Sequence, residues 1–289
     1  MIAMTLLVRD EEDILEANLD FHLSMGVDFV IVTDHRSVDS TPEILERYRR
    51  AGLATVLKQD ADTYDQARWV TKMARMAHDL GASWVINSDA DEFWWPALGT
   101  LRSALAELPE RYDVVSVNRR DFPPVTNETG SFSTRMIYRE VTSFNLLGKP
   151  LPPKVCHRAR ADITVAQGNH AVTGYGIRAT VDDAPIEILH FPLRTYAQFE
   201  RKIASGGAAY EAEGSPAGVG ETWRYAYELW RRGELRGLYA DRALDTDRLA
   251  ERLADETLVV DARLKETLEE IGSAPTATPV KSAARDNHP

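Results

Sequence analysis

The residues best suited to chemistry form an acidic cluster, Asp89, Asp91 and Glu92, directly after the apolar run Trp84–Ser88. Side chains alternate along a strand, so Asp89 and Asp91 can point the same way if the strand geometry continues. Two neighbouring carboxylates repel each other unless a cation or a shared proton lies between them. Hard divalent ions are commonly held by one or two carboxylates together with substrate phosphates. The cluster therefore predicts a metal site, although an isolated Asp-x-Asp also fits a solvated acidic turn.

The composition is that of an ordinary globular protein. The chain has 289 residues, of which 44% are hydrophobic and 27% charged. A formal net charge of −11 argues against a nucleic-acid partner, which usually needs a broad basic face. The negative charge does not exclude an anionic ligand, because a metal and a few basic side chains can create a local positive site.

Several features predict a cytoplasmic protein. Cys156 is the only cysteine, so no intrachain disulfide can form and we expect a packed thiol. The apolar start of the chain meets charge at Arg9, too early for a signal peptide. No window approaches ~20 continuous apolar residues, so no membrane span is expected.

Apolar runs alternate with helical patterns in the first 120 residues. Strands are expected at Ile2–Val8, 29–33, 54–57, Trp84–Ser88 and Val114–Val117, with helices between them. This alternation predicts right-handed βαβ units and a mainly parallel, Rossmann-like sheet with helices on both faces. Ligands of such sheets bind beyond the carboxyl ends of the strands. The polar clusters at 9–13, 34–39 and 89–92 should therefore meet at one edge.

The second half of the chain has a different sequence pattern. From Asp121 onwards, glycines and prolines break the chain into expected short strands at 133–139, 163–166, 171–173, 177–181 and 187–191. This predicts a small, mixed β half packed on the same sheet. Helices are expected at 196–206 and 221–232, and the amphipathic pattern at 247–271 fits one long or two short helices, packed in cis or forming a homodimer contact. Residues 273–289 are expected to be disordered.

Four ordered motifs carry a resemblance to a known family. They are Val8–Arg9–Asp10–Glu11–Glu12; Asp34 with Ser37, Asp39 and Thr41; Asp89–Ala90–Asp91–Glu92–Phe93; and His190–Phe191–Pro192 with Arg194, Gln198, Phe199 and Lys202. Over residues 2–207 this pattern resembles the GT-A glycosyltransferases of the family 2-like kind, in particular the bacterial group related to family 92. The resemblance implies a GT-A catalytic domain at 1–207, with a nucleotide-sugar half (1–120) and an acceptor half (121–207). A C-terminal helical extension (208–272) and the tail (273–289) would follow.

The resemblance also implies residue roles. Asp91 and His190 would bind a divalent metal, and an imidazole ligand favours Mn²⁺ over Mg²⁺. The nucleotide-sugar donor would be held by nine residues: Val8, Arg9, Glu11, Asp34, Asp89, Ala90, Glu92, Arg194 and Lys202. Arg194 and Lys202 can alternatively be surface ion pairs. UDP is the favoured nucleotide, but the family's acidic pair is replaced by Asp34–His35, which leaves GDP and dTDP open.

Sugar transfer with inversion requires a general base that accepts the proton of the acceptor hydroxyl. The position of Asp121 after a strand makes it the first candidate, and Asp182, Asp183, Glu187 and His170 remain open. Several aromatics could stack on sugars or be core residues: Trp94, Trp95, Phe122, Phe191 and Trp223.

The leading hypothesis is therefore a metal-dependent hexosyltransferase that moves a sugar from a nucleotide diphosphate-sugar to a hydroxyl acceptor. A sugar nucleotidyltransferase is one alternative, although it usually needs a Gly-rich basic loop where this chain has an acidic one. A non-catalytic nucleotide- or carbohydrate-binding protein is the other. The Ala- and Arg-rich composition is typical of a GC-rich bacterial genome.

Overall fold

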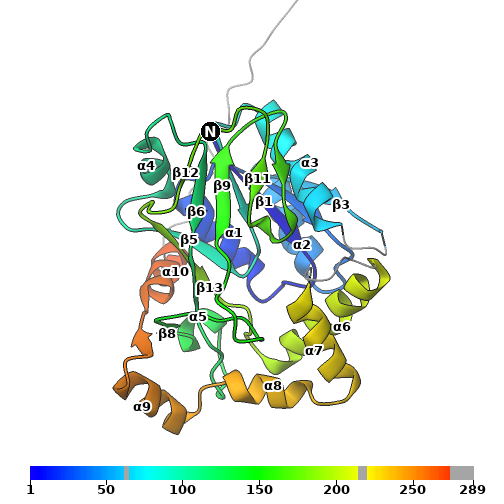
Figure 1. The fold of residues 1–289 in the computed structure, drawn as a ribbon, viewed down its shortest axis with the longest axis vertical. Helices are drawn as coiled ribbons and strands as arrows, with labels where there is room; N and C mark the ends of the chain where they lie inside the picture. Colours follow the sequence, from blue (N-terminus) through cyan, green and yellow to red (C-terminus); the bar gives the residue numbers. More distant parts are fainter. Residues whose placement is uncertain (62–64, 214–219, 274–289) are drawn as a thin grey trace, which may run out of the picture.

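A seven-stranded sheet forms the centre of the fold, in the order β12–β6–β9–β4–β1–β2–β3. The computed structural model describes residues 1–61, 65–213 and 220–273. The tail expected to be disordered, apart from Ser273, lies outside these residues. Figure 1 shows β1 starting at the N-terminus, so the carboxyl ends of the parallel strands face the helices α6, α7 and α8.

The sheet is mainly parallel, as the βαβ pattern predicted. β1 pairs in parallel with β2 and β4, β2 with β3, and β6 with β12, whereas β9 runs antiparallel between β4 and β6. The strands are β1 (Ile2–Val8), β2 (Phe29–Asp34), β3 (Ala54–Lys58), β4 (Trp84–Ser88), β6 (Val114–Val117), β9 (Lys154–Arg158) and β12 (Thr180–Val181).

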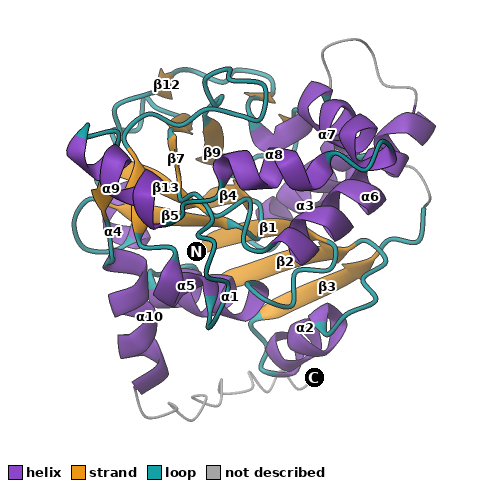
Figure 2. Ribbon diagram, turned by 90° about the horizontal axis from the view of Figure 1, so that it is seen from below, coloured by secondary structure: helices purple, strands orange, loops and turns teal. Residues whose placement is uncertain are grey.

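Helices cover both faces of this sheet, which confirms the predicted α/β class (Figure 2). They are α1 (Leu15–Ser24), α2 (Thr41–Arg50), α3 (Gln66–Asp79) and α4 (Leu101–Ala106). Because strand side chains alternate, Met4 and Leu6 pack with α1, α2 and α4, whereas Ala3 packs with α3 on the other face. These two buried clusters fix the strand ends that carry the polar motifs.

A second, three-stranded sheet lies beside the first. β13 (Ile186–His190) pairs antiparallel with β5 (Glu92–Pro96) and parallel with β7 (Arg119–Asp121). The remaining short elements are η1 (Gln167–Asn169), the hairpin β10 (Thr164–Val165) with β11 (Val172–Thr173), and β8 (Tyr138–Glu140) with β14 (Leu258–Val260). The register of β13 brings three predicted site residues together, as described below.

The C-terminal region is helical, as expected. It contains α6 (Tyr196–Glu213), α7 (Glu221–Arg231), α8 (Leu235–Arg242), α9 (Thr246–Ala254) and α10 (Arg263–Ser273). Helix α6 continues past residue 207, so the expected boundary between catalytic domain and extension falls inside a helix. The region expected to form one long or two short helices forms two, α9 and α10, with β14 between them. Leu264 of α10 is buried in the main core, so this helix packs in cis.

Some local features differ from the sequence-based expectations. Residues 133–139 are not a single strand, because the Ser131 side chain caps the short helix α5 (Phe132–Arg135) before β8 begins. The sequence pattern does not predict strand β9, because prolines precede it and its ends are basic. It does not predict β5 either, because this strand directly follows the acidic cluster. Cys156 is buried and free, as expected.

Within the part of the chain that the structure describes, we find no helix with the length and apolarity needed to cross a membrane.

Candidate active site

The first two polar motifs meet at the carboxyl edge of the sheet, because they follow the parallel strands β1 and β2. The Val38 amide donates to Asp10 Oδ1 at 2.8 Å, and the Glu11 amide donates to Thr41 Oγ1 at 2.9 Å. The Ser37 amide donates to Asp34 Oδ1 at 3.1 Å. The polar residues of the second motif therefore hold the two loops together. Arg9 and Asp34 lie at this edge, and the Arg9 Nε atom is buried with no hydrogen-bond partner among the described residues.

The Asp-x-Asp turn is anchored from below by Asn18 of α1. Its fully buried amide donates to the carbonyls of Ala90 and Glu92, at 3.0 and 2.8 Å. His22 Nδ1 lies 2.8 Å from the Asn18 carbonyl, and Nε2 accepts from the Trp94 amide at 3.2 Å. The sequence reasoning missed Asn18, although a polar residue on the buried face of a helix is a usable signal.

The two carboxylates of the motif do not share a cation. Strand β4 ends at Ser88, and a turn replaces the strand alternation on which the expectation of a common direction depended. Asp89 Oδ2 lies 2.5 Å from Lys154 Nζ, whereas Asp91 Oδ2 lies 2.6 Å from Lys202 Nζ. Each carboxylate is thus neutralised by its own lysine.

His190 lies between two acids. Its Nε2 atom is 3.8 Å from Asp91 Oδ1, and its Nδ1 atom donates to Asp121 Oδ1 at 2.6 Å. The position follows from the register of β13, in which His190 is opposite Glu92 on β5 and Asp121 on β7. The Phe191 amide also donates to the Asp91 carbonyl at 2.8 Å. The structure therefore brings the predicted metal ligands and the predicted base into one cluster.

Arg194 and Lys202 form a buried ion-pair network with the first motif. The Arg194 side chain is fully buried and lies 2.5 Å from Glu11 Oε2 and 2.7 Å from Asp13 Oδ2. Lys202 Nζ lies 3.5 Å from Glu11 Oε1. In this conformation Arg194 exposes no surface to a ligand, whereas Lys202 remains partly exposed.

These charges shift the pKa values of the network. Burial favours the neutral acid, but Lys202, His190 and Arg194 together stabilise the anion more strongly and hold the pKa of Asp91 well below its usual range. Burial raises the pKa of Glu11 despite its cationic neighbours. Burial opposes the charged form of Lys202, yet Asp91 and Glu11 raise its pKa. Asp91 is therefore an anion at neutral pH, as a metal ligand must be.

A second network lies on the other side of the turn. Lys154 Nζ is 3.2 Å from Glu92 Oε1 as well as close to Asp89, and Arg119 approaches the same glutamate at 3.7 Å. The Asn169 amide donates to Asp89 Oδ1 at 3.4 Å. Burial raises the pKa of Glu92 and opposes charge on Lys154, but Asp89 and Glu92 raise the pKa of Lys154. The sequence reasoning missed Lys154 because the residues before it indicated a loop.

The other candidate bases differ in their surroundings. His170 Nδ1 donates to the Pro153 carbonyl at 2.7 Å, and burial, with the charge of Lys154, lowers its pKa to about 4. Glu187 forms an ion pair with Arg263 at 2.7 Å. Asp182 and Asp183 are exposed and follow β12 at the outer edge of the sheet.

Most of the candidate aromatics belong to the core. Trp94, Phe122 and Phe191 are at most 1% exposed and pack in the main cluster. Trp95 stacks on Phe21 with a centroid distance of 5.5 Å. The core alternative therefore describes these residues better than sugar stacking does.

The donor set at Asp91 and His190 fits a divalent metal. A hydrogen bond from Nδ1 to Asp121 leaves the Nε2 lone pair facing Asp91, which is the usual carboxylate–histidine arrangement behind a metal ligand. Among the described residues, no group of three or more His, Cys, Asp or Glu side chains is placed to hold a metal by itself. Any ion bound here would need further ligands from substrate or water.

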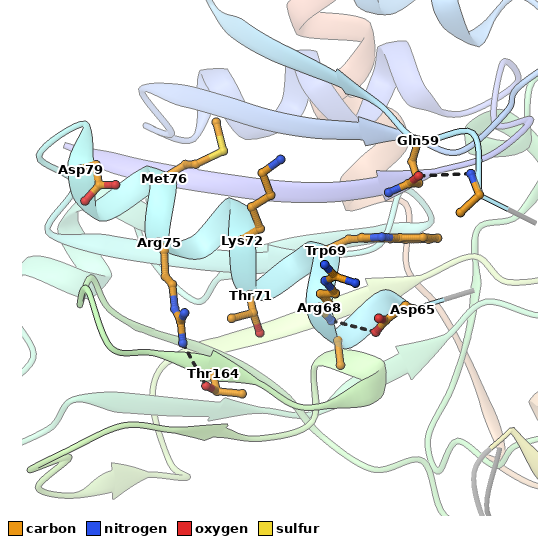
Figure 3. Close-up of a pocket in the computed structure, with 12 residues that line it drawn as sticks. Gln59, Asp65, Arg68, Trp69, Thr71, Lys72, Arg75, Met76, Asp79 and Thr164 are labelled. Atoms are coloured by element: carbon orange, nitrogen blue, oxygen red, sulfur yellow. Dashed lines mark hydrogen bonds between the residues drawn. The ribbon is translucent and has the colours of Figure 1, made fainter. Parts of the chain in front are cut away.

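The structure also has grooves away from this cluster. A groove of about 950 Å³ runs along α3, where Figure 3 shows Arg68 and Lys72 on the helix and Thr164 on the adjoining hairpin. None of the predicted site residues lines it. A smaller groove of about 560 Å³ includes Asp34 and the outer face of α2.

Comparisons with known proteins give only distant likenesses. No family model and no curated protein sequence matches the chain. S. aureus TarS 1–349 is similar to it with a TM-score of 0.44 and 14% identity, over 93% of this chain and 90% of that one, and its complex with UDP-GlcNAc gives the same values. M. tuberculosis glucosyl-3-phosphoglycerate synthase has a TM-score of 0.36 and 14% identity, over 85% and 82%.

Proposed function

We propose that this protein is a metal-dependent GT-A glycosyltransferase that transfers a sugar from a nucleotide diphosphate-sugar to a hydroxyl acceptor, with inversion. One observation carries the proposal. Asp91, His190 and Asp121, from three distant parts of the chain, form a cluster at the carboxyl edge of the sheet, in which His190 Nδ1 donates to Asp121 Oδ1 at 2.6 Å and His190 Nε2 lies 3.8 Å from Asp91 Oδ1. Ligands of open α/β sheets bind at this edge. Asp91 and His190 belong to two of the four motifs that resemble the GT-A enzymes, and Asp121 lies between these motifs in the sequence.

Different residues of the site would bind the nucleoside, the diphosphate and the metal. Val8, Arg9 and Asp34 end or follow the first two strands, where a nucleoside could be bound. Lys202 is the basic side chain placed to reach a diphosphate. A divalent ion at Asp91 and His190 would act as a Lewis acid that stabilises charge on the leaving diphosphate. We favour Mn²⁺ because an imidazole ligand suits it better than Mg²⁺.

Asp121 is the proposed general base. Its Oδ1 atom accepts from His190, and among the described residues no hydrogen bond is made to Oδ2. Oδ2 is therefore the oxygen that could accept the proton of the acceptor hydroxyl. His170 is the alternative, because its Nδ1–H is already donated and Nε2 is left as an acceptor.

Binding calorimetry tests the proposal directly. UDP-, GDP- and dTDP-sugars are titrated into the protein with and without Mn²⁺, and we expect Mn²⁺ to strengthen the binding of at least one, with UDP-sugars favoured. Asp91→Ala should abolish this enhancement while far-UV circular dichroism stays unchanged. Absence of metal-enhanced binding for every sugar nucleotide would rule out the proposed function.

The alternatives make different predictions in the same experiment. A nucleotidyltransferase would bind a nucleoside triphosphate and a sugar phosphate, but its loop after β1 would have to offer basic groups to phosphates. Here the loop contains Glu11 and Asp13, which both form ion pairs with Arg194. A non-catalytic binding protein would bind the donor without releasing nucleotide from it.

A further inference from the structure

Two lysines face the Asp-x-Asp turn, and they differ in burial. The Lys154 side chain is 2% exposed and lies against Asp89 and Glu92. The Lys202 side chain is 26% exposed and lies 2.6 Å from Asp91 Oδ2 and 3.5 Å from Glu11 Oε1. Lys202, the partly exposed lysine, is therefore paired with Asp91, the carboxylate that fits a metal. Lys154, the buried lysine, is paired with Asp89, which does not.

Lys202 and a metal ion compete for the same carboxylate. The Asp91 side chain is only 5% exposed, and its Oδ1 atom faces His190 at 3.8 Å while Oδ2 is held by Lys202. A divalent cation placed between Asp91 and His190 would stand within a few ångströms of the ammonium group. Like charges at such distances repel strongly where water is scarce. Full occupancy of the metal site therefore requires Lys202 to leave Asp91.

We propose that Lys202 is an exchangeable counter-cation. In the free protein it neutralises Asp91 and Glu11, and it moves onto the donor diphosphate when the metal and the sugar nucleotide bind. This inference rests on the proposed function for the identity of the ligand. A lysine suits the exchange because its ammonium is a compact charge on a flexible four-carbon stem.

Lys154 is not equivalent. If its ammonium moved away, the Glu92 side chain, which is 0% exposed, would lose the closest of its two cationic neighbours. Lys154 therefore stays in place and keeps Asp89 neutralised. Of Asp89 and Asp91, only Asp91 is released to bind a metal.

Exchange of this kind makes metal and nucleotide binding cooperative. The diphosphate draws Lys202 from Asp91 and so improves the metal site, and the metal releases Lys202 for the diphosphate. By linkage, each ligand must improve the affinity of the other by the same factor. The free protein should bind Mn²⁺ weakly, and UDP should strengthen that binding.

Calorimetry with Mn²⁺ alone, UDP alone and Mn²⁺ at saturating UDP tests the inference. Removing the competing ammonium in Lys202→Met should tighten binding of Mn²⁺ alone by about tenfold, within the usual range of coupling between sites. The factor by which UDP improves Mn²⁺ affinity should fall by a similar amount. Lys202→Gln provides a second uncharged variant if the first does not fold.

Lys72→Met is the matched control, because it removes one lysine from the exposed face of α3 and should bind Mn²⁺ like the wild type. The inference is overturned if both Lys202 variants bind Mn²⁺ alone no more tightly than the control. The proposed function fails separately, if none of UDP, GDP and dTDP strengthens Mn²⁺ binding by the wild type. In that case tighter Mn²⁺ binding by Lys202→Met would still support the counter-cation role.

Discussion

Lys154 Nζ lies 2.5 Å from Asp89 Oδ2, although 65 positions separate the two residues in the sequence. The contact exists because β9 runs antiparallel beside β4, so that the start of β9 meets the end of β4. A buried cation is thereby placed under the Asp-x-Asp turn. It distinguishes the two acids, since Asp89 is held by a fixed partner and Asp91 by a partly exposed one.

Lys154→Met should destabilise the fold strongly. The substitution leaves Glu92 and Asp89 without their nearest cation, and breaking a buried ion pair on one side costs about 3–5 kcal/mol. Urea denaturation followed by circular dichroism measures the free energy of unfolding. Lys149→Met is the control, because its ion pair with Glu221 is exposed to solvent and should contribute little to stability. Equal effects of the two substitutions would contradict the role given to Lys154.

Asn18→Leu should disturb the turn without touching a carboxylate. It removes the two hydrogen bonds to the carbonyls of Ala90 and Glu92. Among the described residues, this leaves the Ala90 carbonyl without a donor, at a cost of about 1–3 kcal/mol, whereas the Glu92 carbonyl keeps a long hydrogen bond from Ser88 Oγ at 3.5 Å. We expect lower stability and, in the protein that remains folded, weaker Mn²⁺ binding in the presence of UDP. Wild-type metal affinity in a destabilised variant would show that Asn18 supports the fold only.

Asp121→Asn should weaken metal binding and stop turnover. A neutral amide accepts a weaker hydrogen bond from His190 Nδ1–H than the carboxylate does and can also present its NH₂ group to the ring, and loss of such a carboxylate partner typically lowers metal affinity about 10–100-fold. Saturating Mn²⁺ should restore donor binding but not nucleotide release, if Asp121 is also the base. Calorimetry and a nucleotide-release assay with the bound sugar nucleotide measure the two effects.

His170→Gln is the companion variant. We expect it to keep metal affinity and nucleotide release within a few-fold of the wild type, because the glutamine amide can still donate to the Pro153 carbonyl. If His170→Gln loses turnover while Asp121→Asn recovers it at high Mn²⁺, the role of general base passes from Asp121 to His170.

Stability should fall as the pH is lowered from about 6.5 to about 4. Burial lowers the pKa values of His22 and His157 from 6.5 to about 4 in the folded protein. Over this interval the unfolded chain binds protons that the folded protein does not, so protonation favours unfolding. At about 1.4 kcal/mol per pKa unit, each histidine contributes roughly 3 kcal/mol, and the loss is complete near pH 4.

Urea midpoints at several pH values between 7 and 4 measure this dependence. In His22→Gln, the free energy of unfolding should depend less steeply on pH over the same range, and the slope should correspond to the uptake of about one proton fewer on unfolding. An unchanged slope would mean that His22 is not held neutral in the folded protein.

The parallel half of the fold could be predicted because its determinants are local. The strands β1, β2 and β4 are mostly apolar runs followed by polar residues, and β1 and β2 are each followed by a helix. Parallel strands share one carboxyl edge, so the meeting of the motifs followed from the pattern alone. Strand β9 could not be found in this way, because basic residues at its ends and two preceding prolines hide a segment whose first lysine is buried by partners distant in sequence.

The sequence by itself determined the α/β class and the edge at which the polar motifs meet, because these follow from strand periodicity. It offered Asp91 and His190 as site candidates through the resemblance, and Asp121 through its position after a strand. Only the tertiary structure decided how they are connected. The register of β13 places His190 between Asp91 and Asp121, and β9 and α6 each bring a lysine to one carboxylate of the motif. Such pairings depend on which distant segments lie side by side, and charge complementarity over 65 or 111 residues leaves no local pattern in the chain.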